Sequence, residues 1–386
     1  MLPIRVGLIT KEWPPYIYGG AGVHVVQLAQ ALRARADISL SVHCFGMPRT
    51  DAIGYAVPAE FSESNPAIQA MATDLVIADA LSNVDVVHTH TWYANMAGHV
   101  ASMIHGIPHI MSAHSLEPLR PWKAEQLGGG YHISSWVEKS AIESAAAIIA
   151  VSDAMRIDVL SSYPNVDPAK VHTIRNGVDT EKFSPRRDPL VLSRYKITGR
   201  YALFVGRITR QKGLVHLLRA WQDVPPEYGL VIAAGSADEP AVGEEIAELI
   251  TRLQSNRKNV WWIEKMLSQA ELTAVITEAD LFICPSIYEP LGIVNLEAMG
   301  CATAVLASAV GGIPEVVSHG ITGELVNYSM DNRQFENDLT NAIVRLMSQP
   351  ELLTQYGAAG RVRAQSKFGW GEVATATMAL YESVVR

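Results

Sequence analysis

The feature that most constrains the fold of this chain is a repeated alternation of short apolar runs with longer helical patterns. Because the runs lack polar alternation, both faces of each strand must be covered, as in a parallel sheet between two layers of helices. In the first half the runs are IRVGLIT (4–10), ISLSVHCF (38–45), VDVVHTH (84–90), PHIMSAH (108–114), AAIIAVS (146–152) and VHTIRN (171–176). With a helical pattern over residues 23–35 between the first two, they predict a doubly wound α/β domain.

The same pattern restarts near residue 200. The second set of apolar runs is YALFVGRI (201–208), YGLVIAAG (228–235), VWWIE (260–264), LFICPS (281–286), TAVLAS (303–308) and GELV (323–326). A polar stretch with two prolines, residues 183–199, separates the sets and suits a linker. We therefore expect two Rossmann-like domains facing a central cleft, residues 1–190 and 191–368. A closing helix over 369–386 follows, with the first domain as a candidate packing partner.

Composition excludes several classes of protein. A length of 386 residues, 48% of them apolar, suffices for two cores. A formal net charge of −8 disfavours nucleic acid or an anionic membrane as the main partner, since both attract basic surfaces. The N-terminus is too quickly interrupted for a signal peptide, and no apolar run approaches the ~20 residues of a membrane span. The three cysteines show no metal-ligand spacing. We expect a soluble cytoplasmic protein and leave a homo-oligomer open.

Ligands of open α/β sheets bind at the carboxyl ends of the strands, so residues that follow strands are the candidates for chemistry. YGGAGVH (18–24) follows the first strand and opens a helix, where free N–H groups favour an anion. It is not a GxGxxG motif, and a tight turn explains Gly19 and Gly20 equally well.

The stretch FVGRITRQKG (204–213) places two cations, Arg207 and Lys212, just beyond the first strand of the second domain. A guanidinium and an ammonium can neutralise a diphosphate. Two solvated charges are the alternative, and the bracketing glycines, Gly206 and Gly213, favour anion binding.

The stretch PSIYEPLGIVNLEAMG (285–300) carries two carboxylates in an otherwise apolar segment. Glu289 is expected on the exit loop of a strand, and Glu297 about two turns into the helix that follows. An ionised carboxylate accepts two hydroxyl hydrogen bonds, which suits a vicinal diol such as that of ribose. Alternatively, Glu289 only stabilises the dipole at the N-terminus of this helix, and Glu297 lies on the protein surface. The nearby VGGIPE (310–315) is interpreted as a simple turn.

Strand ends of the first domain carry His88, His90 and His114, followed by Trp92 and Tyr93. A zinc site is conceivable, but the HTH spacing on a strand is poor for metal ligation and no carboxylate or thiol joins it. A polar, sugar-contacting wall is the favoured interpretation.

The long loop SLEPLRPWKAEQLGGGY (115–131) carries Arg120, Trp122 and Lys123. Its cations can hold an anionic acceptor, and a mobile surface loop is the alternative. The sequence lacks DxD, GxxxxGK[ST] and GxSxG motifs. Metal-bridged nucleotide-sugar chemistry of the DxD kind, P-loop phosphoryl transfer and a nucleophile elbow are therefore not supported.

Together these motifs resemble the retaining glycosyltransferases of the two-domain GT-B type. The segments KEWPPYIYGGAGVHV, HTHTWY, AHSLEPLRPWK, GRITRQKG and YEPLGIVNLEA are similar, more narrowly, to the actinobacterial enzymes of glycosyltransferase family 4 described as glycogen synthase or maltose-1-phosphate synthase. The resemblance covers nearly the whole chain, and the order and spacing of the motifs are its most specific part.

The resemblance implies an ADP-glucose donor bound mainly by the second domain, retention of the α configuration, and no metal or other cofactor. It implies that Arg207 and Lys212 stabilise the departing ADP and that His114 contacts the transferred sugar. The remaining implied donor contacts are Gly19 and Gly20 to the phosphates, Glu289 to the glucosyl hydroxyls, the main chain of Leu291, Gly292 and Ile293 to sugar and phosphate, and Glu297 to the ribose. The choice of base cannot be inferred from the sequence, and Met266 or Lys265 are the candidates near the expected base pocket.

Two acceptors remain open. Glucose 1-phosphate would be held by Arg120 and Lys123 and would give maltose 1-phosphate, whereas an α-1,4-glucan would use Trp92, Tyr93 and Trp122 as sugar platforms. A lipid-directed mannosyltransferase of the same fold would need a basic amphipathic patch, which the helix over 23–35 does not supply. A non-catalytic two-lobed sugar-binding module is the last alternative.

Overall fold

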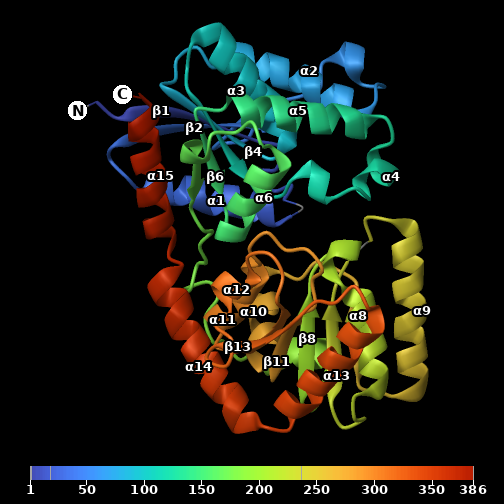
Figure 1. The fold of residues 1–386 in the computed structure, drawn as a ribbon. Coiled ribbons are helices and arrows are strands. Elements are labelled where there is room, and N and C mark those ends of the chain that lie inside the picture. Colours follow the sequence, from blue (N-terminus) through green and yellow to red (C-terminus); the bar gives the residue numbers. More distant parts are fainter. Residues whose placement is uncertain (1, 18, 236, 386) are drawn as a thin grey trace. The chain divides into compact units, whose positions relative to one another are not determined.

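The computed structural model describes residues 2–17, 19–235 and 237–385 (Figure 1). The chain forms two compact units. Unit 1 contains Met1–Asn176 and Trp370–Arg386, and unit 2 contains Gly177–Gly369. Each unit is built around one parallel sheet, so the expected pair of doubly wound α/β domains is confirmed.

Unit 1 contains a seven-stranded sheet in the order β3-β2-β1-β4-β5-β6-β7, with every neighbouring pair parallel. The strands are β1 (Ile4–Thr10), β2 (Ile38–Phe45), β3 (Ile53–Tyr55), β4 (Val86–His90), β5 (His109–Ala113), β6 (Ala147–Ala150) and β7 (Val171–Thr173). The helices are α1 (Gly20–Arg33), α2 (Pro66–Asp79), α3 (Trp92–His105), α4 (Lys123–Leu127), α5 (Gly130–Ser144), α6 (Asp153–Ser162) and α15 (Trp370–Val385).

Unit 2 contains a six-stranded parallel sheet in the order β10-β9-β8-β11-β12-β13. The strands are β8 (Tyr201–Val205), β9 (Gly229–Ala233), β10 (Val260–Ile263), β11 (Leu281–Cys284), β12 (Ala304–Ser308) and β13 (Gly323–Val326). The helices are α7 (Pro189–Arg194), α8 (Leu214–Ala220), α9 (Pro240–Asn256), α10 (Gln269–Glu278), α11 (Ile293–Gly300), α12 (Ile313–Val316), α13 (Asn332–Met347) and α14 (Pro350–Lys367).

The closing helix α15 packs in unit 1, beside α1 and β4 (Figure 1). Its Val373, Met378 and Tyr381 are buried in one apolar cluster with Val6 and Leu28. The Tyr381 hydroxyl is also hydrogen bonded to a ring nitrogen of His88, at 2.7 Å, so the end of the chain seals one face of the first sheet.

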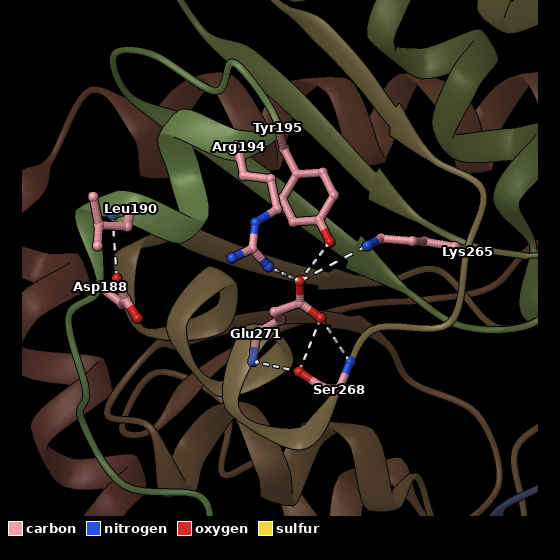
Figure 2. A network of polar contacts seen from close by, with 7 residues as sticks. All are labelled: Asp188, Leu190, Arg194, Tyr195, Lys265, Ser268 and Glu271. Carbon is pink, nitrogen blue, oxygen red and sulfur yellow. Dashed lines mark hydrogen bonds and ion pairs between the residues drawn. The ribbon is translucent and has the colours of Figure 1, made fainter.

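The segment expected to link the domains is instead part of unit 2, because the boundary falls at residue 176 rather than 190. Helix α7 of this segment is tied to α10 through Glu271 (Figure 2). The Glu271 carboxylate accepts hydrogen bonds from Arg194 Nη1 at 2.6 Å and from the Tyr195 hydroxyl at 2.9 Å. Its other oxygen accepts from the Ser268 backbone, at 3.0 Å, in a capping box that begins α10. The polar composition of residues 183–199 suggests a linker, but these hydrogen bonds hold the segment against α10.

We predict that Glu271→Gln lowers the free energy of unfolding by about 1 kcal/mol at pH 7, because it removes the charge that Arg194 and Lys265 face. Hydrogen bonds from Ser268 are the main cause that lowers the pKa of Glu271 from 4.5 to about 2. A lowered carboxyl pKa stabilises the fold above pH 4.5, and this contribution is lost as the pH falls toward 2.

Urea unfolding of wild type and variant at pH 7 and pH 3 measures this effect. The difference between the two proteins should shrink at the lower pH. Glu248→Gln, at an exposed position of α9, is the matched control and should change little. An equal loss of stability at both pH values would contradict the assignment.

Candidate active site

The loop that leaves β11 is held in place by two glycine turns. Gly213 has a φ of +65°, and a Cβ there would lie 1.9 Å from the carbonyl oxygen of Pro285. Gly311 has a φ of +51°, and a Cβ there would lie 2.0 Å from the carbonyl oxygen of Glu289. Only glycine tolerates both the backbone conformation and this close approach. The stretch VGGIPE is therefore more than the simple turn expected, because it helps to fix Glu289.

Lys212 and Glu289 form a buried ion pair at this loop. Lys212 Nζ lies 2.6 Å from Glu289 Oε2, and the two side chains are 15% and 9% exposed. The Ser286 hydroxyl donates to the same carboxylate oxygen at 3.2 Å. Burial is the largest influence and lowers the pKa of Lys212, but the charge and hydrogen bond of Glu289, together with Cys284, outweigh it, so the net pKa is raised. The ammonium is therefore charged at neutral pH.

Arg207 belongs to the same group of charges. Its Nη1 donates to Asp238 Oδ2 at 2.7 Å, and its side chain is 35% exposed. The Arg207 charge opposes protonation of Lys212, so the two cations lie within electrostatic reach of each other. The structure thus brings together Arg207, Lys212 and Glu289 as the sequence predicts, and it adds Asp238 and Ser286, which the sequence analysis missed.

Helix α11 begins beside this ion pair and carries the second carboxyl group. Gly292 is its N-cap, with a φ of +92° and no side-chain capping bond, and it lies between the buried Leu291 and the half-buried Ile293. Glu297 is buried, 9% exposed, instead of lying on the surface. Desolvation raises its pKa to about 8, against the opposing charge of Lys212. Without ligand, this carboxyl is therefore mostly protonated at pH 7, and hydroxyl donors would be needed to favour the acceptor-only form predicted from sequence.

Asn295 lies on the same helix and escaped the sequence analysis. Its side chain is fully buried, and both atoms of its amide lack a hydrogen-bond partner among the described residues. An amide inside the apolar run IVNLEAM is the signal that could have identified it, because buried polar groups without partners are rare.

The expected base contacts lie on the loop after β10. Met266 is 80% exposed. Lys265 Nζ lies 3.8 Å from the carboxylate of Glu271 and 5.2 Å from the ring centroid of Tyr195 (Figure 2). Lys265 therefore takes part in the contacts that hold α7, whereas Met266 presents an apolar side chain at the surface.

In unit 1, the histidines at the strand ends separate into two roles. His88 is fully buried and bonded on both sides, to the Tyr381 hydroxyl at 2.7 Å and the Ser112 hydroxyl at 2.8 Å, so it is part of the core and not of a sugar-contacting wall. His114 is partly exposed, and its Nε2 lies 3.0 Å from Nδ1 of His90. Burial lowers the pKa of His114 to about 4, so the imidazole is neutral at pH 7.

The glycine turn at Gly19 and Gly20 is already hydrogen bonded to a carboxylate side chain of the protein. The Gly19 N–H donates to Oε2 of Glu12 at 2.9 Å, and Gly20 is the first residue of α1. A carboxylate thus takes the N–H group that the sequence analysis assigns to a donor phosphate, and a phosphate would have to displace it.

The expected acceptor loop is built around a buried carboxylate. Glu117 is fully buried and accepts from Arg120 Nη2 at 2.5 Å and from the Ser134 hydroxyl at 2.7 Å. Arg120 is therefore oriented by an ion pair that the sequence did not predict. Lys123 is half-buried and begins α4, directly after the half-buried Trp122.

The two expected aromatic platforms differ. Trp92 is 3% exposed and packs with Ala67 and Ala70, so it is a core residue and offers no face to a sugar. Tyr93 is half-buried and stacks on Trp92 with ring centroids 4.1 Å apart. The Lys11 ammonium lies 3.7 Å from the centroid of the Tyr93 ring.

Two sequence families match the chain. The family described as Glycosyltransferase Family 4 matches residues 18–182, and the family described as Glycosyl transferases group 1 matches residues 194–363. Within the described part of the chain, no helix has the length and apolar character needed to cross a membrane.

Known proteins align with the chain along its whole length. It is 48% identical, over 387 residues, to the alpha-maltose-1-phosphate synthase of Mycobacterium tuberculosis (strain CDC 1551 / Oshkosh), covering 99% of this chain and 100% of that protein. It is 26% identical, over 420 residues, to the glycogen synthase of the same strain, covering 99% and 95%. The solved structure of sucrose-phosphate synthase from Thermosynechococcus elongatus superimposes with a TM-score of 0.80 at 24% identity, covering 98% of each chain.

These similarities confirm both the GT-B fold and the resemblance that the motifs indicate. The chain is a hexosyltransferase and belongs to the glycosyltransferase family that includes the mycobacterial alpha-maltose-1-phosphate synthases.

Proposed function

We propose that this protein transfers glucose from ADP-glucose to glucose 1-phosphate, with retention of the α configuration, to give maltose 1-phosphate. The observation that carries the proposal is the buried Lys212–Glu289 pair, which two glycine turns hold beside Arg207. The 48% identity to an alpha-maltose-1-phosphate synthase over the whole chain supports the choice of product.

The proposed chemistry follows from where charge develops. Breaking the bond between glucose and ADP puts negative charge on the diphosphate and positive character on the anomeric carbon. Lys212 and Arg207 stabilise the leaving diphosphate, and the uncapped N–H groups at the start of α11 assist them. These cations take the place that a metal ion has in other nucleotide-sugar enzymes, so the proposal needs no metal or other cofactor.

Glu289 has a binding role in this proposal and is not a nucleophile. Its carboxylate is held by Lys212 and Ser286, which fits an acceptor of sugar hydroxyls. The acceptor hydroxyl then attacks on the face that the diphosphate leaves, and the departing phosphate takes its proton. This route retains the configuration without a covalent sugar–enzyme intermediate.

Glucose 1-phosphate is proposed as acceptor because unit 1 offers cations on its long loop. Arg120, oriented by Glu117, and Lys123 would hold the phosphate. Elongation of an α-1,4-glucan is the second candidate, and the similarity to a glycogen synthase favours it. Tyr93 and Trp122 are the aromatic side chains left for that role, since Trp92 is buried.

We predict that Lys212→Ala lowers kcat by ~10²–10³, because it removes a cation that stabilises the leaving group. Initial rates with ADP-glucose and glucose 1-phosphate measure the effect. Lys258→Ala, at an exposed lysine of the same unit, is the control and should keep the wild-type rate. Thermal unfolding must show that both variants are folded, and a folded Lys212→Ala enzyme with a wild-type kcat would remove the residue from its role.

We predict that Lys123→Ala raises the KM for glucose 1-phosphate by ~10-fold, because a charge-assisted bond to the phosphate is lost. The rate of extension of a glucan acceptor should stay unchanged, since that acceptor carries no phosphate. Product analysis by phosphorus NMR distinguishes maltose 1-phosphate from longer glucans. Glucan as sole product, with no maltose 1-phosphate, would reject the proposed acceptor.

A further inference from the structure

We propose that His24, His90 and His114 form a binding site for a zinc ion within unit 1. Strands β4 and β5 are neighbours, and His90 ends β4 while His114 follows β5. His24 comes from the second turn of α1. One ring nitrogen of each histidine lies within 4.8 Å of the others, so three elements that are distant in sequence bring three potential ligands to one point.

The separations are close to those that zinc requires. Zinc–imidazole bonds of 2.0–2.1 Å in tetrahedral geometry place ligand nitrogens about 3.4 Å apart. His90 Nδ1 and His114 Nε2 already lie 3.0 Å apart. The ring centroid of His24 is 4.7 Å from that of His114 and 5.5 Å from that of His90. Because the ring nitrogens of His24, His90 and His114 lie within 4.8 Å of one another, the separations that involve His24 must close by at most about 1.4 Å to complete the set.

The hydrogen bond between His90 and His114 must open for a metal ion to bind between their ring nitrogens. One of the two rings now donates its N–H to the other. To bind a metal ion at that nitrogen, the donating ring must carry the proton on its second nitrogen instead. Nε2 of His90 has no hydrogen-bond partner among the described residues.

His24 supplies an independent sign that something belongs at this point. Its side chain is 2% exposed, and Asn176 is a weak hydrogen-bond partner, since neither ring nitrogen has a bond of normal geometry with a described residue. The ring of Trp370 borders it, with centroids 5.3 Å apart. A buried imidazole with so weak a partner is costly, and a metal ion at the nitrogen would relieve that cost.

The ligand set also defines what kind of site this is. Three histidines, one of them the partly exposed His114, are a donor set that zinc takes with a water molecule as its fourth ligand. Ligating histidines usually donate their second N–H to a carboxylate or carbonyl, and His90 lacks such a partner in the described structure. We therefore expect reversible binding that is ~10–100-fold weaker than at a zinc site with a complete outer shell.

Equilibrium dialysis of the full chain against zinc chloride, with metal analysis, tests the proposal without any substrate. We expect one zinc per chain, an affinity at least ~100-fold lower in His24→Asn, and an unchanged affinity in His172→Asn, which alters an exposed histidine of β7 in the same unit. Binding that is absent from the wild type, or equal in His24→Asn, would overturn the proposal.

X-ray absorption of the zinc-loaded wild type decides the matter if His24→Asn does not fold. Three imidazole ligands are expected, and a shell of water and carboxylate oxygens would refute the site. Because neither measurement uses a sugar or a nucleotide, failure here leaves the proposed glucosyl transfer standing. Failure of that transfer likewise leaves the zinc site standing.

Discussion

The buried ion pair of Lys212 and Glu289 is the interaction on which the candidate site depends. Each charge would be costly in this position without the other, and breaking such a pair by removing one partner costs about 3–5 kcal/mol. The backbone around the pair can hold it only because Gly213 and Gly311 allow neighbouring loops to approach within contact of the β11 exit. In the proposed reaction, the diphosphate of the nucleotide sugar replaces Glu289 as the partner of Lys212, and the sugar hydroxyls replace Lys212 as the partner of Glu289.

The two units differ in the charge state of their buried polar groups. In unit 2 the groups near the β11 exit are charged and paired, with Glu297 as the exception because burial keeps its pKa near 8. At the strand ends of unit 1 the histidines are neutral at pH 7 because burial lowers their pKa values. Charged pairs suit the stabilisation of a leaving diphosphate, whereas neutral imidazoles suit hydroxyl groups or a metal ion.

The parallel sheets were predictable because strands buried on both faces leave uninterrupted apolar runs in the sequence. The positions of Arg207, Lys212 and Glu289 beyond β8 and β11 were predictable for the same reason, since Arg207 lies near the end of such a run and Lys212 and Glu289 follow one within a few residues. Strand β3 was missed because it has three residues and is not fully buried. The end of the first unit was misplaced because the stretch over 183–199 is polar like a linker, while its anchor, Glu271, lies more than seventy residues further along the chain.

Side-chain partners were beyond prediction wherever loop conformation decides them. Asp238 lies 31 residues from Arg207, and even the neighbouring pairs of Glu12 with Gly19 and Glu117 with Arg120 become visible only once the loops are placed. Trp92 shows the opposite error. An aromatic residue after a strand suggests a sugar platform, but as the first residue of α3 it packs on Ala67 and Ala70 of α2. The buried carboxyl of Glu297 was located correctly, whereas its protonation state followed only from its burial.

A crystal structure of the protein with ADP-glucose is the decisive test of the proposed donor site. We expect the diphosphate against Arg207 and Lys212 at the start of α11, with Glu289 on the glucosyl hydroxyls and Glu297 on the ribose. A nucleotide sugar bound elsewhere, with the Lys212–Glu289 pair intact and untouched by ligand, would contradict it.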